Sequence, residues 1–165
     1  MKTAGLKQLS ACSDAIEWVA TQKNATEAWA NCERGDWMMW LLARTSAKKL
    51  GSKQHRDLVR AVCKCARLSL KYVPKGEKRP FAAIRAAEKW ADGELAIEIV
   101  NDAAGDAAGA AMAAAMATGD AAMAAWAAMA AGDAARATGD AAYFRTIKRC
   151  AAIVREYFPT PPRLK

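Results

Sequence analysis

Apolar side chains recur at helical spacing along nearly all of this 165-residue chain, and no useful length of it alternates apolar with polar residues. The stretch DAIEWVAT, for example, places Ile16 and Val19 on one helical face. Alternation with period two is typical of a half-buried strand, whereas recurrence every three or four residues indicates an amphipathic helix. We therefore predict an all-α fold, a single-domain bundle of about eight helices.

Helix-capping residues divide the start of the chain. Ser13 or Asp14 can cap the first predicted helix, and Asn24 followed by Glu27 fits a capping box for the second. Gly35 fits the end of that second helix, because glycine readily takes the left-handed conformation found at helix ends. Two short helices are therefore expected before residue 36.

Three further helices are predicted from the same kind of signal. Asp36 is expected to cap a third helix that ends near Gly51, and Ser52 opens a long fourth helix through about Tyr72. Pro80 suits the first turn of a fifth helix, since a residue there needs no backbone N–H.

Alanine dominates residues 101–142, where it fills 23 of 42 positions, and a sixth helix is predicted just before it at 94–104. Four Gly-Asp pairs interrupt this segment, and each glycine can end one helix while the aspartate begins the next. We expect two or three short helices, the last from Asp140 to about Phe158; one continuous helix is the alternative. The anchoring side chains of the alanine-rich faces would be Met112, Met116, Met123, Trp126 and Met129.

We interpret residues 1–158 as one helical domain. It comprises a basic, tryptophan-rich half (1–100), closely packed alanine-rich Gly-Asp repeat helices (101–142) and a C-terminal helix (143–158). The last segment, 159–165, is a proline-rich tail, because proline cannot continue a helix.

Charge is unevenly distributed along the chain. The net charge of +8 divides into +10 over residues 1–89, −7 over 90–142 and +5 over 143–165, which predicts separate basic and acidic surfaces. The five scattered cysteines argue against a disulfide framework and favour a reducing compartment. No signal peptide and no membrane span are recognisable, so we expect a cytoplasmic protein without membrane contact.

A basic stripe is predicted on the helix over residues 52–72. At about 100° per residue, six cations fall within a stripe of about 80°, and Asp57 is the one acid of that helix. Such a stripe fits the phosphates of a nucleic acid or an acidic protein partner; a solvated helix face is the alternative. The six residues are Lys53, Arg56, Arg60, Lys64, Arg67 and Lys71.

The stretch CERGDWMMWLLA is predicted to begin a buried helix. Trp37, Trp40 and Leu41 share one face, and a helix that is apolar nearly all round belongs in a core. An aromatic platform for a base or a cation is the alternative. Beside this core, Glu33 and Arg34 suit ion pairs or helix-terminal bonds. We take the structural motif as Trp29, Glu33, Arg34, Asp36, Trp37 and Trp40.

Signals for catalysis are weak. His55 is the one histidine, and neighbouring cations are expected to lower its pKa. Cys63 and Cys65 point about 200° apart on one helix, so they cannot share a metal ion. We recognise no phosphate loop, dinucleotide fingerprint or metal-ligand motif. The chain is therefore expected to be a non-enzymatic protein with no metal and no cofactor.

The order of motifs along the chain resembles a family of small all-helical proteins. The blocks are WANCERGDWMMWLL, VRAVCKCARLSLKYVPKGEKRP, AIRAAEKWADG, the alanine-rich tract and CAAIVREYFP, of which CERGDW and REYFP are the most specific. The family is identified with immunity proteins of bacterial polymorphic-toxin loci, and similar proteins occur in bacteriophages.

This resemblance implies an inhibitor that binds a bacterial toxin or defence complex, with an anti-CRISPR role as one form of phage-borne counter-defence. It implies the bacterial cytoplasm and carries over no catalytic residue. Immunity proteins against basic nucleases are usually acidic, so the basic stripe suggests an acidic toxin, a nucleic-acid-binding complex, or a partner facing the acidic segment. A nucleic-acid-binding protein that uses the helix at 52–72 is the alternative function.

Overall fold

The computed structural model describes residues 3–47, 49–73, 75–99, 102–103 and 140–164. These residues form helices and connecting segments without a strand, which confirms the all-α prediction. The five anchoring residues expected in the alanine-rich segment lie outside the described residues. The elements are α1 (Thr3–Gln8), α2 (Ser13–Ala20), α3 (Ala25–Asn31), α4 (Gly35–Arg44), α5 (Lys53–Arg67), the 3-10 helix η1 (Leu70–Tyr72), α6 (Arg79–Asp92) and α9 (Asp140–Tyr157).

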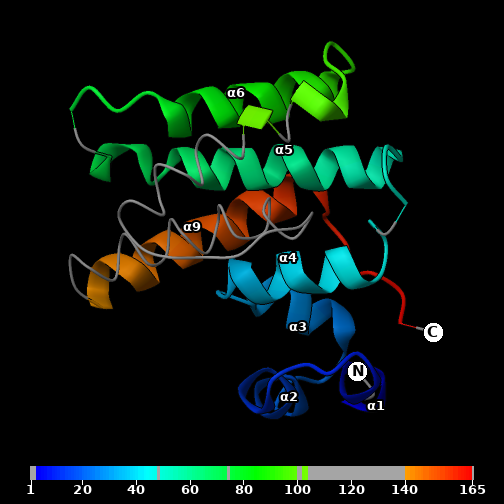
Figure 1. The fold of residues 1–165 in the computed structure, drawn as a ribbon. Helices are drawn as coiled ribbons and strands as arrows, with labels where there is room; N and C mark the ends of the chain where they lie inside the picture. Colours follow the sequence, from blue (N-terminus) through cyan, green and yellow to red (C-terminus); the bar gives the residue numbers. More distant parts are fainter. Residues whose placement is uncertain (1–2, 48, 74, 100–101, 104–139, 165) are drawn as a thin grey trace.

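The helices stack in layers, in the order α6, α5, α9 and α4, with α3, α2 and α1 beyond α4 (Figure 1). Helix α9 lies between α4 and α5, and its Cys150, Ala151 and Val154 are completely buried there. A second, smaller cluster fills the space between α5 and α6, where Ile84 and Trp90 are buried. The main core therefore forms around the helix closest to the C-terminus.

Four of the predicted helix starts are confirmed. The Asn24 side chain accepts a hydrogen bond from the backbone N–H of Glu27 at 2.9 Å, and Ser52 Oγ accepts one from His55 at 3.2 Å. Pro80 lies in the first turn of α6. The helix that follows the last Gly-Asp pair begins at Asp140 and ends at Tyr157, one residue from the predicted end.

Other boundaries differ from the prediction. Cys12, not Ser13 or Asp14, precedes α2 as its N-cap, and no side chain caps that helix. Helix α4 ends at Arg44, well before Gly51, because the Thr45 hydroxyl and backbone turn back onto the last carbonyls.

Three more differences concern helix number and length. Helix α5 ends at Arg67, and η1 continues separately to Tyr72. The prediction missed α1 entirely, a six-residue helix that buries Leu6. The sixth helix was predicted at 94–104, and of these residues 97–99 and 102–103 are helical.

Gly35 begins α4, and the prediction that it ends the preceding helix is wrong. A Cβ added at Gly35 would lie 2.5 Å from Cys150 Cβ and 2.6 Å from the backbone nitrogen of Ala151. Real Cβ atoms do not approach other atoms so closely, and a backbone nitrogen cannot rotate away as a side chain can. Glycine is needed here because the first turn of α4 lies directly against α9.

Hydrogen bonds between α3 and α9 strengthen this packing. The Arg155 guanidinium donates to the carbonyl oxygens of Trp29 at 3.0 Å and Cys32 at 2.8 Å, at the end of α3. In return, Trp29 Nε1 donates to the carbonyl oxygen of Phe158 at 2.8 Å. Since buried polar groups need partners, these bonds satisfy helix-terminal carbonyls that α3 leaves open. They join the CERGDW region to the REYFP region.

The C-terminal tail packs back onto the domain. Leu164 lies against α1, where its Cβ would be 3.2 Å from a Cβ added at Gly5. Leu164 also joins the edge of the main core. Among the described helices, none combines the length and apolar character that crossing a membrane requires.

Replacing Gly35 by alanine should destabilise the protein. Alanine normally favours a helix interior by about 1 kcal/mol over glycine, but the clash with α9 should reverse the sign and cost about 1–3 kcal/mol. Urea denaturation would measure the change in the free energy of unfolding. Gly5→Ala is the matched control, because its nearest neighbours are Leu164 atoms at 3.2 Å, which need to shift by only a few tenths of an ångström. Equal effects of the two substitutions would contradict the close contact of α4 with α9.

Candidate functional site

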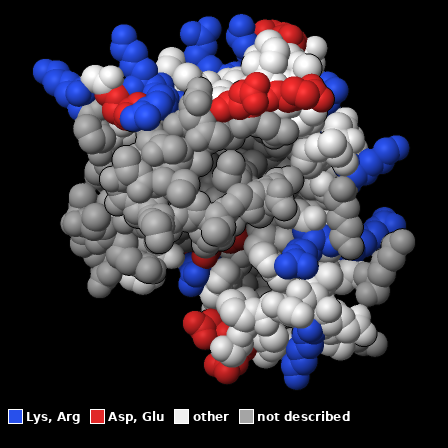
Figure 2. Space-filling model, in the orientation of Figure 1, with Lys and Arg blue, Asp and Glu red and all other residues white. Residues whose placement is uncertain are grey.

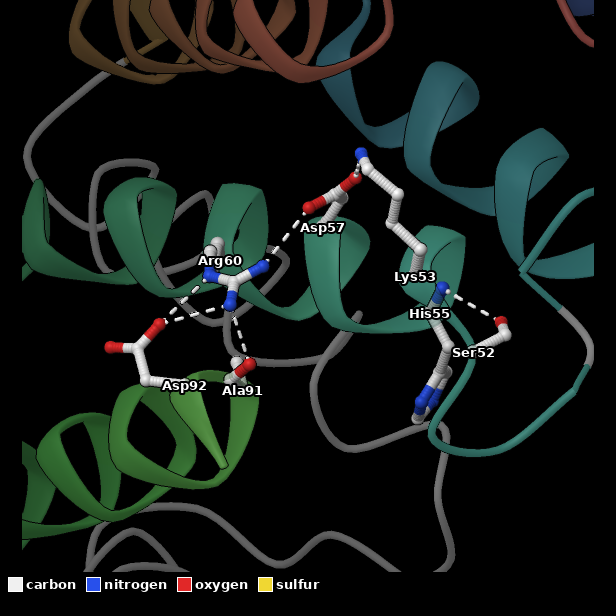
Figure 3. A network of polar contacts seen from close by, with 7 residues as sticks. All are labelled: Ser52, Lys53, His55, Asp57, Arg60, Ala91 and Asp92. Atoms are coloured by element: carbon white, nitrogen blue, oxygen red, sulfur yellow. Dashed lines mark hydrogen bonds and ion pairs between the residues drawn. The ribbon is translucent and has the colours of Figure 1, made fainter. Parts of the chain in front are cut away.

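The basic stripe on α5 makes ion pairs within the molecule (Figure 3). Lys53 Nζ lies 2.6 Å from Asp57 Oδ2, and Arg60 lies 3.0 Å from the other Asp57 oxygen. Arg60 also reaches Asp92 at 3.0 Å and donates to the Ala91 carbonyl at 2.5 Å, both at the end of α6. One guanidinium therefore joins α5 to the C-terminal end of α6, where cations also complement the helix dipole.

Two other cations of the stripe pair with carboxylates of neighbouring helices. Arg67 makes a two-pronged contact with Glu88 of α6, with distances of 2.7 and 2.6 Å. Lys64 lies 2.9 Å from Glu156 of α9. These hydrogen bonds raise the pKa of the Arg67 and Lys64 side chains. The stripe looks nearly uniform in sign along α5 because its acidic partners, apart from Asp57, come from α6 and α9.

The remaining two cations of the stripe differ from each other. The Arg56 guanidinium stacks over the Trp90 ring at 5.8 Å, and its buried Nε is without a hydrogen-bond partner in the described structure. Lys71 is exposed in η1. Five of the six predicted residues thus lie on α5 and the sixth, Lys71, lies on η1, and most of them take part in contacts between helices.

Exposed cations also line the outside of α6. Lys78 precedes α6 as its N-cap, and its position falls within about 40° of Arg85 and Lys89 around the helix axis. All three are exposed, and within the described residues none forms an ion pair. Figure 2 shows Lys and Arg side chains projecting from the edge of the molecule that α6 forms, with carboxylates beside them. We call Lys78, Arg85, Lys89 and the neighbouring Phe81 the α6 outer face.

Phe81 gives this face an aromatic group. It is 43 % exposed, and the Arg67 guanidinium lies 5.5 Å from its ring centroid. This face does not stand out in the sequence because its cations are interspersed with Glu88 and Asp92. The structure separates the two sets, since both acids turn toward α5. The signal present in the sequence was the spacing of 78, 85 and 89, which is helical.

The tryptophan-rich motif divides into a core side and an outer side. Met38, Met39 and Leu42 are the deeply buried residues of α4, whereas Trp37 and Trp40 are only half-buried at the edge of the core. The prediction of a largely buried helix holds, but methionines, not these tryptophans, fill its centre. Trp29 is 5 % exposed and belongs to the core.

The polar residues of the motif form the expected ion pairs. Arg34 binds both oxygens of Asp36, at 2.9 and 2.6 Å, and Glu33 pairs with Lys148 of α9. The hydrogen bond to Asp36 raises the pKa of Arg34, whose guanidinium stacks 4.2 Å above the Trp37 ring. Asp36 therefore does not cap α4 as predicted, because Arg34 occupies its carboxylate.

His55 and the buried thiols serve packing between helices. Burial lowers the pKa of His55, which lies edge-on to Trp90 and accepts a hydrogen bond from the Gly51 N–H. Cys63 faces α6 and Cys65 faces α9, as their spacing predicted. Burial raises the pKa of Cys63 to about 12, so this thiol stays protonated at neutral pH. Over the described ranges, no three acidic, cysteine or histidine side chains gather as a metal site would need.

Comparisons of this chain with protein-family models, with curated proteins and with solved structures found no match.

Arg60 should contribute more to stability than Lys53, although both pair with Asp57. Arg60→Met removes charge-assisted bonds to two carboxylates and a carbonyl and should lower the free energy of unfolding by about 1–3 kcal/mol. Lys53→Met is the matched control. Lys53 is 84 % exposed, so its loss should change the same quantity by less than about 0.5 kcal/mol. Chemical denaturation of both variants provides the comparison, and a larger loss for Lys53→Met would contradict the role given to Arg60.

Proposed function

We propose that this protein is a non-enzymatic inhibitor, of the immunity or phage counter-defence (anti-CRISPR-like) type, that binds an acidic surface of a bacterial toxin or defence complex. The observation that carries the proposal is the α6 outer face. Its three cations project into solvent without acidic partners among the described residues, whereas the α5 cations have internal carboxylates. The resemblance of the CERGDW and REYFP blocks to immunity proteins supports the same function.

The α6 outer face suits partner binding because it is held rigidly. Ile84, Trp90 and Ala91 bury the opposite side of α6 against α5. Arg60 and Arg67 fix the helix through Asp92 and Glu88. Cations on a fixed helix lose less entropy on binding than cations on a loop, and an exposed basic face accelerates encounter with an acidic partner.

Binding to this face needs no rearrangement of the interior. Arg60, Lys64 and Arg67 of α5 already hold carboxylates at 2.6–3.0 Å, which a partner would have to displace or share. Lys78, Arg85 and Lys89 hold no carboxylate of the described residues, so they have no such bonds to break there. The proposed contact surface therefore lies one helix away from the stripe selected in the sequence.

A nucleic acid is the second candidate partner, and Phe81 is the observation that favours it. An exposed aromatic ring among cations can stack on a base while the cations follow the phosphates. A protein partner and a nucleic acid differ in their response to nuclease treatment and to salt.

Reversing the charge of the α6 outer face should abolish partner binding. The variant is Lys78→Glu with Arg85→Glu and Lys89→Glu, and the measurement is capture of partners from bacterial lysate, treated with nuclease and washed at low and high salt. We expect the native protein to retain one protein partner through nuclease treatment and the variant to lose it. The control reverses Lys7, Lys23 and Arg163, three exposed cations elsewhere, and so has the same net charge.

The results separate the two candidates. If nucleic acid alone is recovered and is lost at high salt, the protein is a nucleic-acid-binding protein and the inhibitor proposal is wrong. If both triple variants lose the protein partner equally, overall charge matters for binding and the position of the α6 outer face does not. Unfolding of the variant is not expected, since the three side chains make no bonds within the described residues.

A further inference from the structure

An apolar cavity of about 310 Å³ lies at the other end of the bundle, between α1, α2, α3 and α4. Four of the six tryptophans of the chain line it, namely Trp18, Trp29, Trp37 and Trp40. Helix α6 contributes nothing to its wall, so the cavity is separate from the proposed partner surface. Its volume is near the lower limit for pockets that hold small molecules.

Small and large residues together line the cavity. Ala15, Ala25 and Ala28 of α2 and α3 take up little of the space beside the indoles. Trp18 and Trp37 pack against each other with their ring centroids 6.2 Å apart and their planes tilted by 57°, so together they form a continuous aromatic part of the wall. Two half-buried tryptophans of α4 thus keep apolar area exposed that an occupant could cover.

Charge restricts the kind of occupant. Asp36 is the one charged side chain that the described part of the chain places in the cavity wall, and both of its oxygens are already bound by Arg34. A charged occupant would therefore lose its hydration without gaining an ionic partner, which is costly in an apolar site. Flat indole walls favour a planar ring, because aromatic groups pack well against each other in offset or edge-to-face contacts.

We propose that this cavity binds a small, uncharged aromatic molecule of about the size of indole. Binding would cover the apolar area of Trp37 and Trp40 that their packing leaves exposed, and it would fill the space beside the three alanines. The proposal does not depend on the partner function of the α6 outer face, since the two sites share no residue.

Indole itself is the probe, and methionine methyl signals of the full chain in NMR spectra are the readout. Met38 lines the cavity, whereas the neighbouring Met39 is equally buried but does not line it. We expect indole to shift the Met38 methyl signal in a saturable way, to leave that of Met39 unchanged, and to raise Tm. Indole-3-acetate and tryptamine, which add a negative or a positive charge to the same ring, should bind at least tenfold more weakly.

Blocking the cavity supplies a second test. Ala28→Leu places a larger side chain in the wall and should abolish the Met38 shift, whereas Ala82→Leu, on the exposed side of α6, should leave it intact. If Ala28→Leu fails to fold, binding of indole, indole-3-acetate and tryptamine to the native protein still tests the proposal. The proposal is overturned if indole leaves Met38 unshifted up to its solubility, if both charged analogues bind as tightly, or if folded Ala28→Leu binds indole normally.

Discussion

The contact of Gly35 with α9 is the constraint on which the main core depends. Because the first turn of α4 lies against the backbone at Cys150 and Ala151, α4 can approach closely enough to bury Met38 and Leu42. The same approach brings the end of α3 to Arg155, which binds its open carbonyls. It also positions the tryptophans that form the cavity wall. A single missing methyl group therefore determines how the N-terminal helices join the rest of the bundle.

Charge in this protein has two structural roles. Helix α5 lies between α6 and α9, so cations along its edges meet Glu88, Asp92 and Glu156 and hold three helices together. Each of these partly exposed pairs is worth little alone, but Arg60 combines several bonds in one group. Cations that point away from α5 on the α6 outer face are left for solvent or a partner. Position within the stack of helices, more than the number of charges, thus separates structural cations from cations available for binding.

Local signals allowed much of the fold to be predicted, whereas the site depends on contacts between distant segments. Asn24, Ser52 and Pro80 act within one turn of chain, and each has the role that its type and position predict. Gly35 was misinterpreted because its need for glycine comes from α9, more than a hundred residues away. The α5 stripe looked unpaired because its interhelical carboxylates come from other helices. Glu88 and Asp92 belong to α6, and Glu156 belongs to α9. The cavity is equally non-local, because residues of four helices form it.

Native-state hydrogen exchange most directly tests whether α4, α5 and α9 form one cooperative unit around Gly35. Buried amides near Leu42, Val62 and Val154 should all exchange through the same opening. The free energy of that opening should equal the free energy of global unfolding from denaturation, because none of the three helices can leave without exposing the common core. If α9 amides exchange through a smaller opening while those of α4 and α5 remain protected, then α9 is not the element that holds the core together.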